Sequence, residues 1–267
     1  MKQGFVKVAS ATPRIRVADP VYNAQVICEQ AKEAAEHGAK IVVFPELCIT
    51  GYTCNDLFLQ ELLLEKAKEA LLTIAEETGQ LETLFLVGLP VDKDGRLYNV
   101  AAVLYRGRIL GMIPKKNIPM YAEFYEGRHF TPGEETVTEY RLGKQVIPFG
   151  SNLLFRCEEL PELILGCELC EDLWVAEPPS TSHALMGATV IANLSASNET
   201  VSKDDYRTLL IKASSARLLC GYIYTSAGEG ESTQDLVFGG HDLIAENGTL
   251  LVQSARFTTG ILYTDLD

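Results

Sequence analysis

The sequence lacks several features that mark common functional classes. Its 267 residues carry 23 Lys and Arg against 36 Asp and Glu, a formal net charge of −13. Nucleic acids and anionic membranes attract proteins that present a positive face, so neither is expected as the main partner. No apolar run is long enough to span a bilayer. What is present is an ordinary globular composition, 47% hydrophobic and 22% charged, which predicts a substantial core.

Metal-binding and secretion signals are also missing. The four histidines show no His-x-x-x-His spacing, and Cys167-x-x-Cys170 has no second pair that would complete a zinc site, so no metal is expected. Lys7 interrupts the apolar stretch near the N-terminus, which therefore predicts a first strand better than a signal peptide. Because the seven cysteines are odd in number and scattered through apolar segments, we expect reduced thiols in a cytoplasmic protein.

Helix-like and strand-like segments alternate along the chain. Residues 114–152, with several prolines and glycines, predict one long irregular segment of functional importance. No linker or repeat divides the sequence, so the pattern predicts a single α/β domain over residues 1–267 with a mixed sheet. The predicted helices are 19–38, 58–78, 174–186 and one from Asp204 or Asp205 to Cys220; the predicted strands are 5–8, 41–44, 84–89, 163–167, 188–194, 221–226 and 261–264, with hairpin turns at 92–95, 106–107 and 247–248.

Three reactive side chains follow strand-like segments. Glu46 comes after the buried run 41–44, Lys115 follows Ile113-Pro114, and Cys170 lies between a strand and a helix. Strand ends are where an α/β fold collects its active-site residues. Taken singly, each residue also has a simpler interpretation: a surface carboxylate, a solvated lysine and a core cysteine. Spacing alone does not show that the three meet.

The sequences around these residues resemble the nitrilase superfamily. Phe44-Pro45-Glu46-Leu47 with Thr50-Gly51-Tyr52 is similar to its glutamate motif, Lys115-Lys116-Asn117-Ile118-Pro119 to its lysine motif, and Cys170-Glu171-Asp172 to its cysteine motif. Residues 119–126, 170–174, 193–197 and 227–233 most resemble the glutaminase domain of glutamine-dependent NAD synthetases. The resemblance extends from the first strand to about residue 264, and it implies a nitrilase-like four-layer α-β-β-α sandwich.

The resemblance implies a role for each of the three residues. Cys170 would be the nucleophile, Glu46 the base, and Lys115 the donor that stabilises the oxyanion. A neighbouring lysine cation would also favour the thiolate of Cys170. Lys116 is a competing candidate, but Lys115 directly follows Pro114 and has the family's interval to the later Ile-Pro pair.

The resemblance also implies residues that bind substrate. Glu123 would be a second active-site glutamate that positions substrate or water, with a plain loop carboxylate as the alternative. Glu171 would bind an α-ammonium group or act as a structural partner, while Tyr121, Ser197 and Lys203 would contact glutamine. Lys203 stands where relatives are expected to have arginine, which weakens the case for a bidentate carboxylate clamp. The acidic, glycine-containing run 228–240 lacks phosphate-binding spacing and is expected to be a loop at the substrate mouth.

The implied activity is hydrolysis of L-glutamine, with the ammonia passed to ATP-dependent amidation of deamido-NAD. The amidase step needs no cofactor. No Ser-Gly-Gly-x-Asp-Ser type loop occurs in the 267 residues, so ATP, Mg²⁺ and the synthetase domain are expected downstream in the same polypeptide or in a separate one. A homo-oligomer is also expected. Two alternatives stay open: a stand-alone amidase for another small amide, and a non-catalytic scaffold that contributes oligomer contacts.

Overall fold

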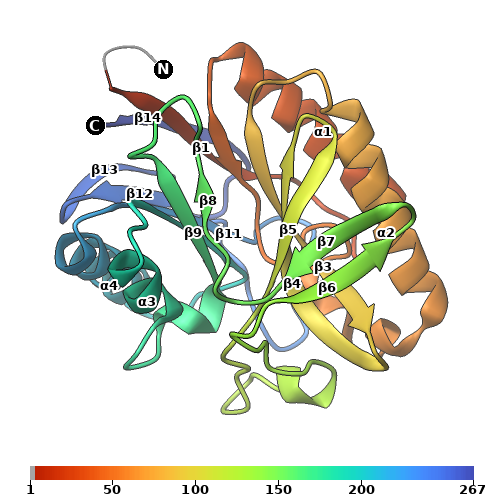
Figure 1. The fold of residues 1–267 in the computed structure, drawn as a ribbon. Helices are drawn as coiled ribbons and strands as arrows, with labels where there is room; N and C mark the ends of the chain where they lie inside the picture. Colours follow the sequence, from red (N-terminus) through yellow and green to blue (C-terminus); the bar gives the residue numbers. More distant parts are fainter. Residues whose placement is uncertain (1–3) are drawn as a thin grey trace.

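Two β-sheets pack face to face in the structure, a computed structural model that describes residues 4–267 (Figure 1). Each sheet mixes parallel and antiparallel pairs. The eight-stranded sheet has the order β14 (Gly260–Leu266), β1 (Val6–Thr12), β2 (Ile41–Val43), β3 (Leu84–Lys93), β4 (Arg96–Tyr105), β5 (Arg108–Pro114), β7 (Gln145–Phe149), β6 (Thr138–Leu142). The six-stranded sheet has the order β13 (Thr249–Gln253), β12 (Leu243–Glu246), β11 (Gly221–Ser226), β10 (Val190–Ser195), β9 (Ile164–Leu169), β8 (Phe155–Arg156).

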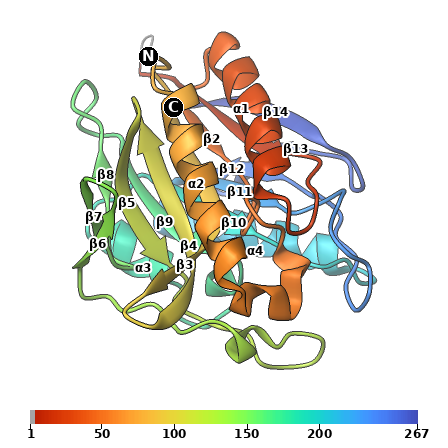
Figure 2. The ribbon, with the colours of Figure 1, turned by 90° about the vertical axis from the view of Figure 1, so that its right-hand side faces the viewer.

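Helices cover the outer face of each sheet. α1 (Pro20–Glu36) and α2 (Glu61–Glu77) lie side by side on the eight-stranded sheet (Figure 2), while α3 (Pro179–Leu185) and α4 (Lys203–Leu218) cover the six-stranded one. The predicted four-layer α-β-β-α sandwich is confirmed. No helix in residues 4–267 is long and apolar enough to cross a bilayer. Three short 3₁₀ helices lie in the loops: η1 (Tyr52–Leu59), η2 (Glu126–Arg128) and η3 (Cys170–Leu173).

The local sequence explains the elements that position the site. β2 is buried along its whole length because it pairs in parallel with β1 on one side and β3 on the other, and its apolar sequence Ile-Val-Val suits that position. α1 begins where the Asp19 carboxylate accepts a hydrogen bond from the Tyr22 amide at 3.1 Å, with Pro20 in the first turn. Because β2 is paired on both sides, the residues that directly follow it have a fixed position in the fold.

Apolar side chains from both sheets fill the space between them. Val43 and Leu86 from one sheet and Leu194 and Ile223 from the other are fully buried there. The apolar layer is interrupted by buried polar contacts such as that between the Ser10 and Thr225 hydroxyls, 2.6 Å apart. Packing on both faces holds the strands of the two sheets rigidly against each other.

Some sequence predictions were wrong in detail. Residues 114–152 are not irregular throughout, because β6 and β7 form a hairpin around Gly143-Lys144. The helix predicted over 174–186 is reduced to α3, since Pro178-Pro179 can only stand at a helix start. The helix predicted from residue 58 begins at Glu61, because η1 occupies the preceding residues. α4 begins at Lys203, earlier than either aspartate.

Candidate active site

Glu46 lies in a tight turn directly after β2. Its backbone amide donates to the Ser195 carbonyl of β10 at 3.2 Å, so the turn is tied to the opposite sheet. The turn passes over Gly88 of β3, where an added Cβ would lie 2.3 Å from the Leu47 nitrogen and 2.6 Å from the Pro45 oxygen. Only glycine allows this approach, so the position of the Glu46 backbone depends on the missing side chain at residue 88.

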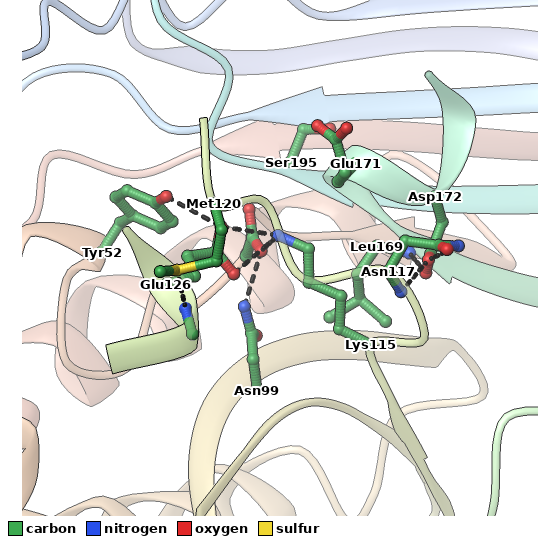
Figure 3. A network of polar contacts seen from close by, with 12 residues as sticks. Tyr52, Asn99, Lys115, Asn117, Met120, Glu126, Leu169, Glu171, Asp172 and Ser195 are labelled. Carbon is green, nitrogen blue, oxygen red and sulfur yellow. Dashed lines mark hydrogen bonds and ion pairs between the residues drawn. The ribbon is translucent and has the colours of Figure 1, made fainter. Parts of the chain in front are cut away.

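Lys115 lies at the end of β5 and is fully buried. Its ammonium Nζ donates to Glu46 Oε1 at 2.7 Å and to the Glu126 carboxylate at 2.7 and 2.9 Å (Figure 3). Glu126 also accepts a 2.8 Å bond from the Tyr52 hydroxyl. Lys116, the competing candidate, instead pairs with Glu135 at the surface. The structure therefore brings Lys115, and not Lys116, to Glu46.

The two carboxylate oxygens of Glu46 have different surroundings. Oε1 accepts from Lys115 and from the Asn99 amide, the latter at 2.6 Å. Oε2 is buried and has no hydrogen-bond partner among residues 4–267. Leaving a buried carboxylate oxygen without a partner costs free energy, so its presence calls for a functional explanation. Oε2 is the atom of Glu46 that is free to accept a proton.

Cys170 opens η3 directly after β9. Its backbone φ is +43°, a conformation that costs free energy for a residue other than glycine and is found at sites that aim one side chain. The thiol is buried and lines one cavity with Glu126, whose carboxylate is bonded to the same Lys115 ammonium as Glu46. The three residues named from the sequence therefore share one site, built from the ends of β2, β5 and β9.

The charge balance of this centre differs from the sequence-based expectation. Burial and the charge of Glu46 raise the pKa of Cys170, and Lys115 offsets them only in part. Burial would lower the pKa of Lys115, but the carboxylates of Glu126 and Glu46 raise it well above its ordinary value. Burial also raises the pKa of Glu126, and the two acidic side chains bonded to Lys115 compete with the thiol for its charge. The geometry favours a neutral thiol that loses its proton during attack.

Asp172 joins the cysteine segment to the lysine segment. Its Oδ2 accepts from the Leu169 amide at 3.0 Å, and its Oδ1 accepts from the backbone amide and side-chain amide of Asn117, each at 2.8 Å (Figure 3). Burial raises the pKa of this carboxyl to about 6. One carboxylate thus holds Leu169, directly before Cys170, and Asn117, two residues after Lys115, in fixed positions relative to each other.

A pocket of about 410 Å³ opens beside Cys170 and Glu126. This volume is in the range of small-molecule sites. All five remaining sequence-predicted site residues line it: Tyr121, Glu123, Glu171, Ser197 and Lys203. The structure thus gathers them around the same cavity as the cysteine.

Glu123 does not contact Lys115, and the second carboxylate there is Glu126. Glu123 instead accepts a hydrogen bond from the Asn198 amide, whose oxygen accepts from the Lys203 ammonium. Glu123 is therefore tied to the pocket wall. The glutamate against Lys115 is Glu126, which the sequence analysis did not name, and the role predicted for Glu123 in positioning substrate or water stays a prediction.

The pocket mouth carries charges of both signs. The Tyr121 hydroxyl donates to the Glu171 carboxylate at 2.9 and 3.1 Å. The Lys203 ammonium, also on the pocket lining, lies 5.2 Å from the ring centre of Trp174 and 5.5 Å from that of Phe124, an arrangement typical of cation–π contacts. Burial lowers the pKa of Lys203. The pocket lining thus contains an acidic side chain, Glu171, and a basic one, Lys203, which together suit a ligand that carries both charges.

A buried arginine supports the wall from behind. Arg207 of α4 is fully buried and donates to Ser197 Oγ and to the Asn198 carbonyl, each at 3.2 Å. It also pairs with Glu199 at 2.9 Å. Sequence reasoning did not identify Arg207, Asn99, Asp172 or Glu126. Asn99 offered a signal, because it is a polar residue that directly precedes the apolar run 100–104 of β4.

Known sequences resemble the chain over almost its full length. The model of the carbon-nitrogen hydrolase family matches residues 7–267. The chain is 43% identical over 260 residues to the glutamine-dependent NAD(+) synthetase of Mycobacterium bovis, covering 97% of this chain and 38% of that protein. It is 32% identical to the protein of the same name from Thermotoga maritima, covering 100% and 42%. The chain thus spans about two fifths of the length of these relatives.

Solved structures share the fold. A glutamine-dependent NAD(+) synthetase from Cytophaga hutchinsonii superposes with a TM-score of 0.89 at 28% identity, covering 98% of this chain and 43% of that one. An amidase from Nesterenkonia superposes with a TM-score of 0.78 at 21% identity, covering 98% and 93%, and this similarity concerns the fold alone. The matching family model and the shared fold agree with the geometry of Glu46, Lys115 and Cys170. The chain belongs to the carbon-nitrogen hydrolase family.

Proposed function

We propose that this chain is a glutamine amidase that supplies ammonia to an NAD synthetase. The observation that carries the proposal is the pocket itself, which is lined by the buried Cys170 and by the partly exposed, oppositely charged Glu171 and Lys203. Glutamine carries an α-ammonium, an α-carboxylate and a distal carboxamide. Its two charges suit Glu171 and Lys203, and its carboxamide would then face the thiol.

The first half of the reaction follows from the free oxygen of Glu46. Glu46 Oε2 takes the thiol proton as Cys170 Sγ attacks the carboxamide carbon, which avoids a free thiolate in a site that already holds two carboxylates. Lys115 donates to the oxyanion that forms. The C–N bond then breaks, Glu46 returns its proton to the departing nitrogen, and ammonia leaves behind a glutamyl thioester.

The second half regenerates the thiol. Water attacks the thioester carbonyl and gives a proton to Glu46, and Lys115 again stabilises the oxyanion. The C–S bond breaks, Cys170 recovers its proton, and glutamate leaves. The sum is glutamine plus water to glutamate plus ammonia, with every step carried by side chains of this chain.

The destination of the ammonia rests on the relatives. Two fifths of their length corresponds to this chain, and their names describe glutamine-dependent NAD(+) synthesis. We propose that a synthetase domain, in the same or another polypeptide, binds ATP and Mg²⁺ and uses the ammonia to amidate deamido-NAD. The cytoplasmic location and the homo-oligomer expected from the sequence stay predictions, and light scattering tests the second.

A substrate panel tests the proposal. We expect ammonia release from L-glutamine that exceeds release from asparagine, simple aliphatic amides and ω-amides lacking the α-amino group, and no release by Cys170→Ala. A glutamine-shaped diazoketone should label Cys170 and no other thiol. Faster turnover of an aliphatic amide would identify a stand-alone amidase, and absence of both turnover and labelling would identify a scaffold. Either result would overturn the proposal.

A further inference from the structure

Asn99 touches two members of the catalytic centre at once. Its side-chain amide donates to Glu46 Oε1 at 2.6 Å, and its backbone carbonyl accepts from the Lys115 amide at 2.8 Å. Asn99 itself is fully buried at the position where β4 continues its antiparallel pairing with β5. The residue that bonds the carboxylate is therefore held by the strand that carries the lysine.

We propose that Asn99 is a positioning residue: it fixes which oxygen of Glu46 acts as the base and sets that base at a constant distance from Lys115. This inference rests on the proposed amidase function. Without a second donor, the Glu46 carboxylate could rotate and share both oxygens with the Lys115 ammonium. With Asn99 and Lys115 both bonded to Oε1, Oε2 is left without a hydrogen-bond partner among residues 4–267.

The chemical type of the donor matters. A second cation in place of Asn99 would stabilise the ionised carboxylate more strongly and make it a weaker base. A neutral amide holds the oxygen without adding charge. The amide therefore orients Glu46 while leaving the charge balance of the centre to the four titratable groups that face it from other elements: Lys115 after β5, Glu126 on η2, Cys170 on η3 and Tyr52 on η1.

A substitution at Asn99 can remove a single side-chain hydrogen bond. The Asn99 Oδ1 has no hydrogen-bond partner within the described part of the chain. Asn99→Leu, which is similar in shape, thus removes the bond to Glu46 and no other side-chain hydrogen bond. Asn99→Asp keeps the shape but places a second carboxylate against Glu46. The backbone bond to Lys115 is unaffected by either change.

The test measures kcat and KM for glutamine across the pH range. Asn99→Leu should lower kcat at neutral pH roughly 10- to 100-fold, the effect of a hydrogen bond to a charged group, while KM stays within about threefold. The acidic limb of the kcat profile should move to higher pH, because the ionised base has lost a donor. Asn99→Asp should move the limb further, because a proton is shared between two carboxylates.

A matched control separates position from stability. Asn193 is another fully buried asparagine, and its side chain bonds Tyr222 and Ser195. Asn193→Leu should lower the melting temperature without moving the acidic limb. If the limb of both Asn99 variants coincides with that of the wild type, or if Asn99→Leu keeps kcat within twofold, the proposal is overturned.

A second readout does not depend on glutamine. The rate at which iodoacetamide alkylates Cys170, followed by peptide mass spectrometry that separates it from the half-buried Cys157, reports proton removal from the thiol. The pH profile of this alkylation rate should move to higher pH in the Asn99 variants, as the acidic limb of the kcat profile does. Should the wild type fail to hydrolyse glutamine, the proposed function falls while this shift still supports Asn99, and an unshifted alkylation profile would contradict its role.

Discussion

The buried centre beside the pocket (Glu46, Lys115 and Cys170, here the floor) and the partly exposed residues that line the pocket (Tyr121, Glu171 and Lys203, here the mouth) are built in different ways. At the floor, Glu46 and Lys115 are fully buried at strand ends and bonded on several sides. At the mouth, Tyr121 is half exposed, and its contacts and those of Lys203 come from loops and the start of a helix. The packed sheets therefore fix the positions of the reacting side chains. The residues that contact substrate lie on loops and at a helix start, which can vary in sequence without disturbing the sheets.

The largest expected loss of activity comes from removing the base in the buried centre. Glu46→Gln keeps the side-chain shape but removes the base, so kcat should fall about 10²- to 10⁴-fold with little change in KM. Steady-state ammonia release measures it, with Cys170→Ala as the blank and thermal melting as the check on folding. Retention of more than a tenth of the wild-type kcat would show that Glu46 is not the base.

A change at Gly88 should damage the floor without touching a reacting group. Gly88→Ala would push the Glu46 turn outward, because the new Cβ would meet the Leu47 nitrogen at 2.3 Å. A displacement of this kind should cost on the order of 10²-fold in kcat. Gly111→Ala in β5 is the control, since its Cβ would meet only Phe155 and Leu153 side chains and should cost stability alone. Equal kcat losses in the two variants would contradict the account.

Lys203 should show the opposite kinetic signature. Lys203→Met keeps a long chain that can pack on Trp174 but loses the charge, so KM for glutamine should rise roughly 10- to 100-fold. Because the floor is untouched, kcat should stay within about threefold. Saturation curves for Lys203→Met and Lys203→Arg measure kcat and KM separately. A large fall in kcat with constant KM would show that Lys203 takes part in the reaction and does not serve only to bind glutamine.

The smallest effect concerns the layer between the sheets. Burial raises the pKa of Asp242 to about 7, well above its unfolded value, so its contribution to stability is complete below about pH 4 and is lost as the pH rises through about 7. Asp242→Asn can still accept from Thr12 and should flatten this part of the pH dependence by a few degrees of Tm. Melting curves between pH 4 and 8 measure it, and an unchanged slope would exclude Asp242 as the source.

The sequence predicted some residues of the buried centre and missed others. Glu46, Lys115 and Cys170 could be named because motif residues follow strands whose apolar pattern is plain. Glu126 was missed because residues 119–126 have no helical or strand period, so nothing in the sequence distinguishes it from Glu123. Asn99 was missed because its partner Glu46 lies 53 residues away in sequence. Only the folded sheet, in which β3 lies between β2 and β4, brings the two residues together.

The hairpin β6–β7 shows the same limit in the fold. Tyr140, Leu142 and Ile147 are buried core residues on alternating strand positions, but prolines and glycines around them suggested a continuous loop. Tertiary packing, which the local pattern does not report, decided the structure there.

The most direct test of the account is an acid quench of the enzyme within its first turnovers, followed by mass measurement of the intact chain and its peptides. The account predicts an adduct of glutamine less ammonia on Cys170 in the wild type, no such adduct in Cys170→Ala, and a much slower one in Glu46→Gln. Glutamine turnover with an adduct on another residue, or an adduct that forms equally fast without Glu46, would contradict it.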